Sequence, residues 1–330
     1  NQKTKNAQSV KTLKTRCKLA LTGTPIENSL AELWSIFDFL MPQYLFNYHY
    51  FQKQYESSIV KNNDEEKTKQ LKKLVTPFIL RRNKKEVLKE LPDKIEQNMI
   101  LPFSDEEEKI YVANLAKVNE ELQQLYDIEG SDKTQILKML TRLRQLCLEP
   151  RLVYDNIDQP SSKLKACMEL IKTMQENKQK VLLFSSFTSA LDLIAEECQK
   201  AGITYYMLTG STNKEERREL VSRFQKDDTT LFLISLKAGG TGLNLTSAEN
   251  VIHYDPWWNV SAQNQATDRA YRIGQKSNVQ VFNLVMKDSV EEKIIEMQKR
   301  KKELADMFVE NNSGGLSQMS KEDILSLFTM

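Results

Sequence analysis

The sequence is poor in cysteine and histidine and contains no long apolar run. Its four cysteines and two histidines do not show the spacing of a metal site, and we expect reduced, buried thiols in a cytosolic protein. No apolar stretch approaches the ~20 residues that a membrane-spanning helix needs. The composition therefore argues against a zinc protein, a disulfide-rich secreted protein and a membrane-spanning protein.

The start of the chain lacks two further features. Residues 1–5 have no apolar core of the kind found in a signal peptide. They also have no initiating methionine, so we expect a piece of a longer protein.

The sequence also lacks the phosphate-binding loop of nucleotide hydrolases. The pattern G-x-x-x-x-G-K-[ST] does not occur, and no acidic Mg²⁺-binding motif follows a predicted strand. The glycine-rich residues 239–242 are followed by Leu243, so the lysine that would neutralise the β- and γ-phosphates is missing. Taken alone, this stretch is typical of a tight turn between a strand and a helix. We therefore expect no metal site and only part of an ATP site in this chain.

The charge of the chain is nearly balanced. Charged residues make up 28% and hydrophobic residues 40%, which is typical of a soluble globular protein. The length of 330 residues allows about two domains of ~150 residues each. Because the formal net charge is only +2, any binding to nucleic acid must come from local clusters of basic residues.

The N-terminal half is predicted to be mostly helical. Residues 17–21 indicate a short apolar strand, and apolar residues at helical spacing follow it. Ser104 and Glu107 have the spacing of a capping box that opens another helix. A further amphipathic helix is expected at 136–148. We therefore predict helices over most of 29–150, without repeated strand–helix–strand units.

The periodicity changes after Ser161. Short apolar or β-branched runs now alternate with helical segments, and Thr212 with Glu215 predicts a capped helix. Such alternation predicts an α/β fold with a parallel sheet covered by helices, and ligands bind at the carboxyl ends of its strands. The expected strands are 181–184, 203–208, 230–236, 250–254 and 279–285, the helices 161–176, 189–201, 214–225 and 262–271, and the ligand-binding loops 185–188, 209–212, 237–242 and 255–259.

Two arginines near the end of this half carry the strongest chemical signal. Arg269 and Arg272 lie three positions apart in a segment predicted to be helical, so they would share one face. Each guanidinium is a permanent cation with a fork of donors that matches phosphate oxygens. Phosphoryl-transfer enzymes use such groups as arginine fingers on a γ-phosphate. An arginine pair at this spacing can also be a solvated helix face.

Five ordered blocks cover almost the whole chain, namely 21–28 with 32–34, 78–82 with 84–87 and 91–92, 236–245, 255–259 and 268–275. In this order they resemble motif III, the linker between lobes, and motifs V, Va and VI of the Swi/Snf-related DNA-dependent ATPases of helicase superfamily two. Two positions depart from the family pattern, since Tyr271 stands where His is usual and Val260 where Pro is common. The double tryptophan at 257–258 is more similar to the bacterial branch than to chromatin remodellers, so the resemblance implies a location in the bacterial cytosol or nucleoid.

The resemblance implies a domain organisation. Residues 1–28 would be the remnant end of a first RecA-like lobe, and 29–160 a mostly helical insertion and linker. Residues 161–288 would form a second RecA-like lobe, and 289–330 a C-terminal helical brace or tail. The lobe with the phosphate loop and acidic box would lie outside this chain and would be its partner. The chain alone is therefore expected to bind ATP poorly and to hydrolyse none.

The resemblance also implies a nucleotide-binding role for several residues. Arg269 and Arg272 would be catalytic and contact the γ-phosphate of ATP, whose Mg²⁺ the other lobe would hold. Gln265 would help to hold the arginine helix. Gly240 and Gly242 would approach the nucleotide closely.

Other residues would contact double-stranded DNA. Trp258 would contact the groove or a base face, with a core tryptophan as an equal alternative, and Trp257 is expected to be the buried member of the pair. Thr22 and Thr24 would couple nucleotide state to DNA engagement, or cap a turn at a strand end. Phosphate contacts, which position DNA without reading its sequence, are expected from Ser185, Ser186, Thr209, Gly210, Lys237 and Thr241.

Three functions remain open at this point. The first is a DNA-dependent ATPase that translocates on double-stranded DNA. The second is a strand-separating RNA or DNA helicase, against which the long helical insertion and the Gly-Leu-Asn-Leu block argue. The third is a non-catalytic module that binds nucleic acid or protein.

Overall fold

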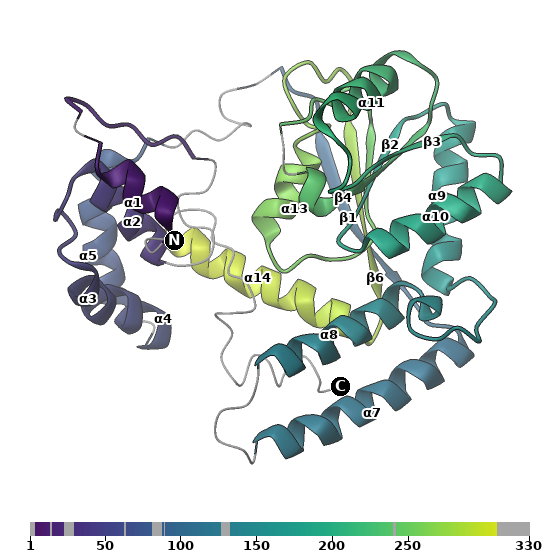
Figure 1. The fold of residues 1–330 in the computed structure, drawn as a ribbon, viewed down its shortest axis with the longest axis horizontal. Coiled ribbons are helices and arrows are strands. Elements are labelled where there is room, and N and C mark those ends of the chain that lie inside the picture. Colours follow the sequence, from purple (N-terminus) through teal and green to yellow (C-terminus); the bar gives the residue numbers. More distant parts are fainter. Residues whose placement is uncertain are drawn as a thin grey trace. The chain divides into compact units, whose positions relative to one another are not determined.

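The chain divides into two compact units (Figure 1). The helical unit consists of Asn1–Val87 with Trp258–Ser261 and Met297–Met319, and the sheet unit mainly of Leu88–Trp257 and Ala262–Glu296. The computed structural model describes residues 4–13, 15–22, 30–62, 64–80, 88, 90–126, 133–239 and 242–308.

The sheet unit is built around six parallel strands in the order β1-β6-β5-β2-β4-β3. The strands are β1 (Lys94–Leu101), β2 (Val181–Ser185), β3 (Tyr205–Leu208), β4 (Leu231–Ser235), β5 (Asn250–His253) and β6 (Val279–Met286). The apolar runs of β2 and β4 are buried along their whole length, as expected for strands covered on both faces. The predicted α/β fold with a parallel sheet is confirmed.

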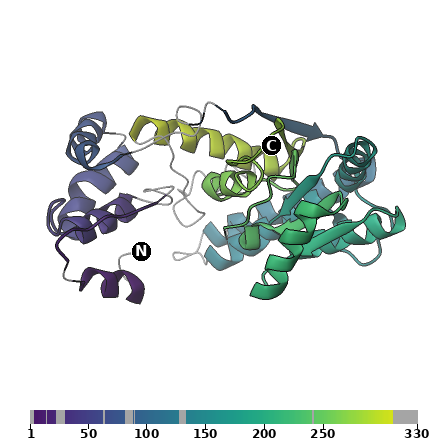
Figure 2. The same ribbon diagram turned by 90° about the horizontal axis from the view of Figure 1, so that it is seen from above.

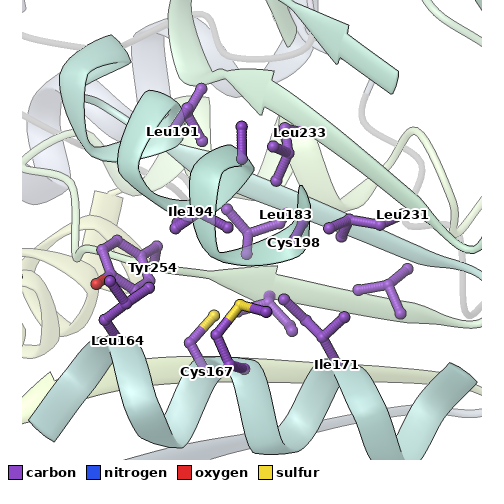
Figure 3. Close-up of a cluster of buried hydrophobic side chains, with 14 of the residues drawn as sticks. Leu164, Cys167, Ile171, Leu183, Leu191, Ile194, Cys198, Leu231, Leu233 and Tyr254 are labelled. Carbon is purple, nitrogen blue, oxygen red and sulfur yellow. The ribbon is translucent and has the colours of Figure 1, made fainter. Parts of the chain in front are cut away.

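Helices cover both faces of this sheet. The helices described after β1 are α7 (Asp105–Tyr126), α8 (Lys133–Leu148), α9 (Ser162–Glu176), α10 (Thr188–Lys200), α11 (Lys214–Lys226), α12 (Leu236–Gly239), α13 (Val260–Thr267) and α14 (Val290–Phe308), with a 3₁₀ turn at Pro150–Leu152. Along β2, Val181 and Leu183 pack with α9 and α10, whereas Leu182 and Phe184 pack with α11 and α13. Figure 3 shows the first of these layers, to which Leu183 contributes.

Strand β1 was missed by the sequence prediction. It pairs in parallel with β6 over its 8 residues and forms one edge of the sheet, where Figure 2 shows it as a blue arrow. Its sequence KIEQNMIL is half polar, and most of its side chains are exposed, as is common for an edge strand. Most of the described residues in 29–150 are helical, as predicted, and the strand was missed because an edge strand carries no continuous apolar signal.

The helical unit packs around aromatic and aliphatic side chains. Its described helices are α1 (Lys5–Lys11), α2 (Leu30–Leu40), α3 (Tyr48–Phe51), a π-helical turn at Gln52–Glu56, α4 (Ser57–Asn62), α5 (Glu65–Val75) and a 3₁₀ turn at Thr76–Phe78. The apolar stripe of α2 buries Leu33, Trp34 and Phe37 against Phe51 and Leu71. The helical signal in this part of the sequence was thus correct.

The strand expected at 17–21 is absent from the structure. Residues 15–22 have no regular secondary structure, and Leu19 and Leu21 are 83% and 100% exposed. A strand needs a neighbour that pairs with its backbone groups, and none of the described strands pairs with this segment. The apolar side chains of 17–21 are therefore not buried in a sheet of the described residues.

The helix caps confirm one predicted capping box and correct another. The N–H of Ser104 donates to Oε2 of Glu107 at 2.8 Å, and the N–H of Glu107 donates to Oγ of Ser104 at 3.4 Å. The predicted box therefore opens α7. At α11, however, the cap is Asn213, whose Oδ1 accepts an N–H three positions later at 2.9 Å. Thr212 accepts a backbone N–H of its own turn instead, so the box predicted for it is wrong.

The cysteines of the chain are free thiols. Cys147, Cys167 and Cys198 are buried as predicted, whereas Cys17 is exposed. Burial raises the pKa of Cys198 to about 12, so this thiol stays protonated near neutral pH. Among the residues that the structure describes, no cluster of three or more His, Cys, Asp or Glu could hold a metal ion, and no helix is long and apolar enough to cross a bilayer.

Candidate nucleotide and nucleic-acid site

The predicted site residues of the sheet unit lie mostly beyond the carboxyl ends of the strands. Strand β2 ends at Ser185, β3 at Leu208, β4 at Ser235 and β5 at His253, and the predicted residues follow in the next connections. Parallel strands present their carboxyl ends at one edge of the sheet, which is where ligands bind in this class of fold. The topology therefore gathers these connections at a common edge.

Helix α13 ends at Thr267, so Arg269 and Arg272 lie in the turns after the helix and not on its face. The carbonyl of Arg269 accepts a 3.0 Å hydrogen bond from the N–H of Leu245, which lies in a distant loop. Gly274, with a φ of 103°, then bends the chain in a way that favours glycine. The helix predicted at 262–271 is present but ends four residues early: the N–H groups of Arg269 and Ala270 bond to carbonyls three positions back, so the chain leaves the α-helix in a tighter turn.

The two arginine side chains influence each other electrostatically. Arg269 is half-buried and Arg272 is exposed. Burial lowers the pKa of Arg269, and the positive charge of Arg272 lowers it further, while Asp268 opposes the shift. Arg269 nevertheless stays cationic, because the ordinary pKa of a guanidinium lies far above neutral pH. The Nη1 of Arg272 donates to the carbonyl of Leu243 at 3.4 Å, and no carboxylate of the described residues forms an ion pair with it.

Gln275 fixes the backbone that follows the arginines. Its side chain is only 7% exposed. Its Nε2 donates to the carbonyls of Ala248 and Ala270 at 2.8 and 3.3 Å, and its Oε1 accepts the N–H groups of Lys276 and Ser277 at 2.8 and 3.0 Å. The sequence analysis gave Gln275 no role. A buried amide that saturates four backbone groups has no periodic signature in a sequence.

A second glutamine, Gln263, fixes α13 on the sheet. Its Oε1 accepts the N–H of Trp257 at 3.3 Å, and its Nε2 donates to Oδ1 of Asn283 on β6 at 2.9 Å. Thr267, one turn later, bonds to Nε2 of His253 at 2.9 Å. The holding role predicted for Gln265 stays a prediction, since its side chain makes no hydrogen bond to another described residue.

Ser185 and Ser186 take part in a buried polar cluster beyond the end of β2. The Oγ of Ser185 and the N–H of Ser186 donate to Oδ1 of Asp255 at 2.7 and 2.9 Å, and the Oγ of Ser186 donates to Oδ2. The Nη2 of Arg144 lies 2.8 Å from the same Oδ2. Ser185 is only 1% exposed, so the predicted DNA contact of its hydroxyl does not fit the structure. Ser186 remains half-buried.

Arg144 was also missed by the sequence analysis. It reaches this cluster from α8 and is 6% exposed. Its guanidinium carbon lies 4.9 Å from the ring centroid of Phe187 and 5.4 Å from that of Trp257, so both aromatic rings cover the cation. Helix α8 is thereby joined to the connections after β2 and β5. The only available signal was an arginine inside an amphipathic helix, which normally indicates an exposed residue.

The order of burial of the two tryptophans is the reverse of the prediction. Trp258 is 7% exposed, whereas Trp257 is half-buried and packs at the border of the α11–α13 layer. The N–H of Trp257 bonds to Gln263, and its ring lies against the guanidinium of Arg144. A DNA contact from Trp258 is therefore supported less by its surroundings than the sequence suggested.

The remaining predicted DNA contacts are accessible where they are described. The Oγ1 of Thr209 lies 2.8 Å from Oγ of Ser211 in the turn after β3, and Gly210 in that turn is exposed. Lys237 is exposed on α12, directly after β4. Thr22 is exposed in an irregular segment, so its alternative role as a cap at a strand end is not supported, and its coupling role stays a prediction.

The glycine-rich stretch shows why small residues are needed there. A Cβ on Gly239 would lie 2.9 Å from Cε1 of Phe184, so α12 can pack on β2 only without a side chain. Gly242 is exposed and has a φ of 28°, and a Cβ there would meet nothing within 4 Å. The predicted residues Gly240, Thr241 and Thr24 lie outside the described residues.

Comparisons with known proteins identify the family. Residues 1–152 match the model of the SNF2-related domain, and residues 162–274 match the helicase conserved C-terminal domain. The SWI2/SNF2 ATPase core of Sulfolobus solfataricus in complex with double-stranded DNA is 34% identical, with a TM-score of 0.59, over 99% of this chain and 70% of that one. The chain belongs to the SNF2-related ATPases. The resemblance inferred from the sequence motifs is confirmed.

Curated relatives extend this result. An uncharacterized ATP-dependent helicase of Mycoplasma pneumoniae is 37% identical over 99% of the chain, and YwqA of Bacillus subtilis is 38% identical over 100%. An ISWI chromatin-remodeling complex ATPase of Saccharomyces cerevisiae is 33% identical over 99%. The chain spans only about a third of these relatives, at 31%, 36% and 30% of their lengths.

Proposed function

We propose that this chain is the C-terminal part of an ATP-driven translocase on double-stranded DNA. In this proposal the sheet unit supplies two arginines to ATP and contacts the DNA backbone. A lobe with a phosphate loop, on the same longer protein, supplies the rest of the ATP site. The family membership, the fold and the arrangement at the carboxyl edge of the sheet support this function.

One observation carries the proposal. Arg269 and Arg272 lie close together, since the positive charge of Arg272 lowers the pKa of Arg269, and Arg272 is exposed. Three backbone connections fix this segment: Leu245 to Arg269, Arg272 to Leu243, and Gln275 to Ala248. A polyanion would relieve the repulsion, and a fixed pair of guanidinium groups fits the charge that develops on a transferring phosphoryl group.

ATP is the anion that the family implies. Its triphosphate would be delivered by the other lobe together with Mg²⁺, since no described cluster of carboxylates in this chain could hold a metal. Arg269 and Arg272 would act on the γ-phosphate by donating hydrogen bonds to its oxygens. Such a contribution is worth roughly a thousandfold or more in rate.

The DNA contacts proposed for this chain use the backbone of the duplex. Lys237 and the turn containing Thr209 and Gly210 are exposed beyond β4 and β3. Phosphate contacts of this kind position a protein without sequence preference, as a translocase requires. The solved structure of the Sulfolobus core contains double-stranded DNA, which supports the choice of duplex over single strands.

The test compares activities of the longer protein that contains this chain. ATP hydrolysis is measured with duplex DNA, single-stranded DNA and RNA, and strand displacement is measured on forked duplexes. We expect stimulation by duplex DNA and no strand displacement. Stimulation by single strands with displacement would favour a strand-separating helicase, and no ATPase activity in any condition would favour a binding module.

The chain itself provides a second test. Purified residues 1–330 are expected to bind ATP poorly and to hydrolyse none, because the phosphate loop is absent from the sequence. Turnover by the purified chain, abolished by Arg272→Ala, would show that it contains a complete ATP site and would contradict the proposed division between two lobes.

A further inference from the structure

Helix α11 is tied to the loop that follows α12 by a single glutamine. The Nε2 of Gln225 donates to the carbonyl of Asn244 at 2.8 Å, and its Oε1 accepts the N–H of Ser247 at 3.0 Å. Both ends of the amide are therefore used, and both partners are backbone groups. Gln225 fixes the course of the main chain here, whatever side chains the loop carries.

The same loop contacts the arginine segment through other backbone groups. The N–H of Leu245 donates to the carbonyl of Arg269 at 3.0 Å, and the carbonyl of Leu243 accepts from Nη1 of Arg272 at 3.4 Å. Residues 243–247 therefore bond to Gln225 on one side and to both arginines on the other.

This loop depends on hydrogen bonds for its precise course, because it contains no regular secondary structure. Leu243 and Leu245 are buried and anchor it to the core, but packing is not directional and leaves the carbonyl orientations open. Upstream of the loop, Arg217 of α11 donates from Nη1 to the carbonyl of Ala238 in α12 at 3.4 Å. Helix α11 thus bonds to the chain both before and after the glycine-rich stretch.

We propose that Gln225 is a positioning residue for the arginine segment: through residues 243–247 it sets where Arg269 and Arg272 point. The inference rests on the proposed function, because it assigns Gln225 to the same nucleotide site. Gln225 touches neither ATP nor DNA in this account. It acts on the chemical step through the backbone of the loop, and its own helix supplies the rigid support.

The test uses the longer protein that contains this chain. Gln225→Leu removes both hydrogen bonds at similar size, and Gln225→Glu keeps the acceptor for Ser247 but loses the donor to Asn244. Ser222→Ala, an exposed change on the same helix, is the matched control. With saturating duplex DNA, Gln225→Leu is expected to lower kcat about tenfold, because small misplacements of catalytic groups are costly. Its KM for ATP is expected to stay within about twofold.

The glutamate variant and the control refine this expectation. Gln225→Glu is expected to lose less activity than Gln225→Leu, and Ser222→Ala to keep wild-type kinetics. A purely structural role would lower the Tm of Gln225→Leu and leave kcat unchanged at temperatures where the protein is folded. That result would overturn the inference.

Hydrogen exchange of the chain itself gives a readout independent of activity. In Gln225→Leu, amide exchange is expected to rise at least about fivefold in residues 242–247 and also in 268–275, with the strands unchanged. Faster exchange confined to 242–247 would show that losing the Gln225 hydrogen bonds does not affect the arginine segment, and would contradict the proposal.

Arg272→Ala separates this inference from the proposed function. If wild-type protein hydrolyses ATP and Arg272→Ala does not, but Gln225→Leu is normal, only the role of Gln225 is wrong. If the wild-type protein shows no ATPase activity, the proposed function fails, and the exchange experiment alone decides whether Gln225 positions the segment.

Discussion

The guanidinium of Arg144 lies 2.8 Å from the carboxylate of Asp255, and both side chains are buried, at 7% and 1% exposure. This ion pair joins α8 to the connection after β5. It also orders the end of β2 through Ser186, whose Oγ accepts from Arg144 at 2.9 Å. Helix α8 lies within the residues that match the SNF2-related domain, and the pair ties it to a residue that matches the helicase C-terminal domain.

Arg144→Met is expected to destabilise the chain by about 3–5 kcal/mol, because it leaves the carboxylate of Asp255 buried without its cation. Combining it with Asp255→Asn should cost much less than the sum of the single changes. Urea unfolding of the two single variants and the double variant measures this, with the exposed Lys165→Ala as control. Additive effects would contradict the coupling.

His253 is expected to make stability depend on pH. Burial lowers its pKa to about 4, and it packs between Phe184 and Thr267 as a neutral ring. The unfolded chain binds a proton below the ordinary pKa of ~6.5, whereas the folded chain does so only near the lowered value. The contribution of neutral His253 to the free energy of unfolding is therefore fully present above about pH 6.5 and is lost as the pH falls towards 4.

Protonation of His253 in the unfolded chain is expected to lower the free energy of unfolding by about 2 kcal/mol between pH 7.5 and pH 5. Unfolding free energies of the wild type and of His253→Gln over this range isolate it, because the carboxylates are common to both proteins. The variant should show the shallower dependence. Parallel curves would mean that His253 does not titrate as the structure implies.

Lys237→Ala is expected to weaken DNA binding equally across sequences. Each phosphate contact that is lost should reduce the slope of log K against log salt by about one. Binding to duplexes of different sequence, measured at several salt concentrations, provides the test. Lys172→Ala on α9 is the charge-matched control, since that helix packs on the opposite face of the sheet from α11 and α13. A change in sequence preference would contradict a backbone contact.

The order of strands and helices in the sheet unit could be predicted because it depends on local patterns. The runs at β2 and β4 are continuous and apolar, and Ser104 with Glu107 carries a capping signal within four residues. Strand β1 could not be found in this way, since an edge strand is exposed and half polar.

The course of the arginine segment and the buried polar pairs could not be predicted either. Residues 262–271 carry a helical signal, but the helix ends at Thr267, and no local pattern contains the bond that joins the carbonyl of Arg269 to the N–H of Leu245 in a distant loop. Lys163 and Glu291, 2.7 Å apart and almost fully buried, are likewise charged residues on helices, whose pairing only the tertiary fold determines.

The most direct test of the account is the duplex-stimulated ATPase activity of the longer protein with Arg269→Ala and Arg272→Ala combined. The exposed Arg218→Ala on α11 is the matched control. The account predicts that the double variant loses at least about a thousandfold in kcat while its affinity for duplex DNA stays within a few-fold of wild type. An ATPase rate within a few-fold of wild type would contradict it.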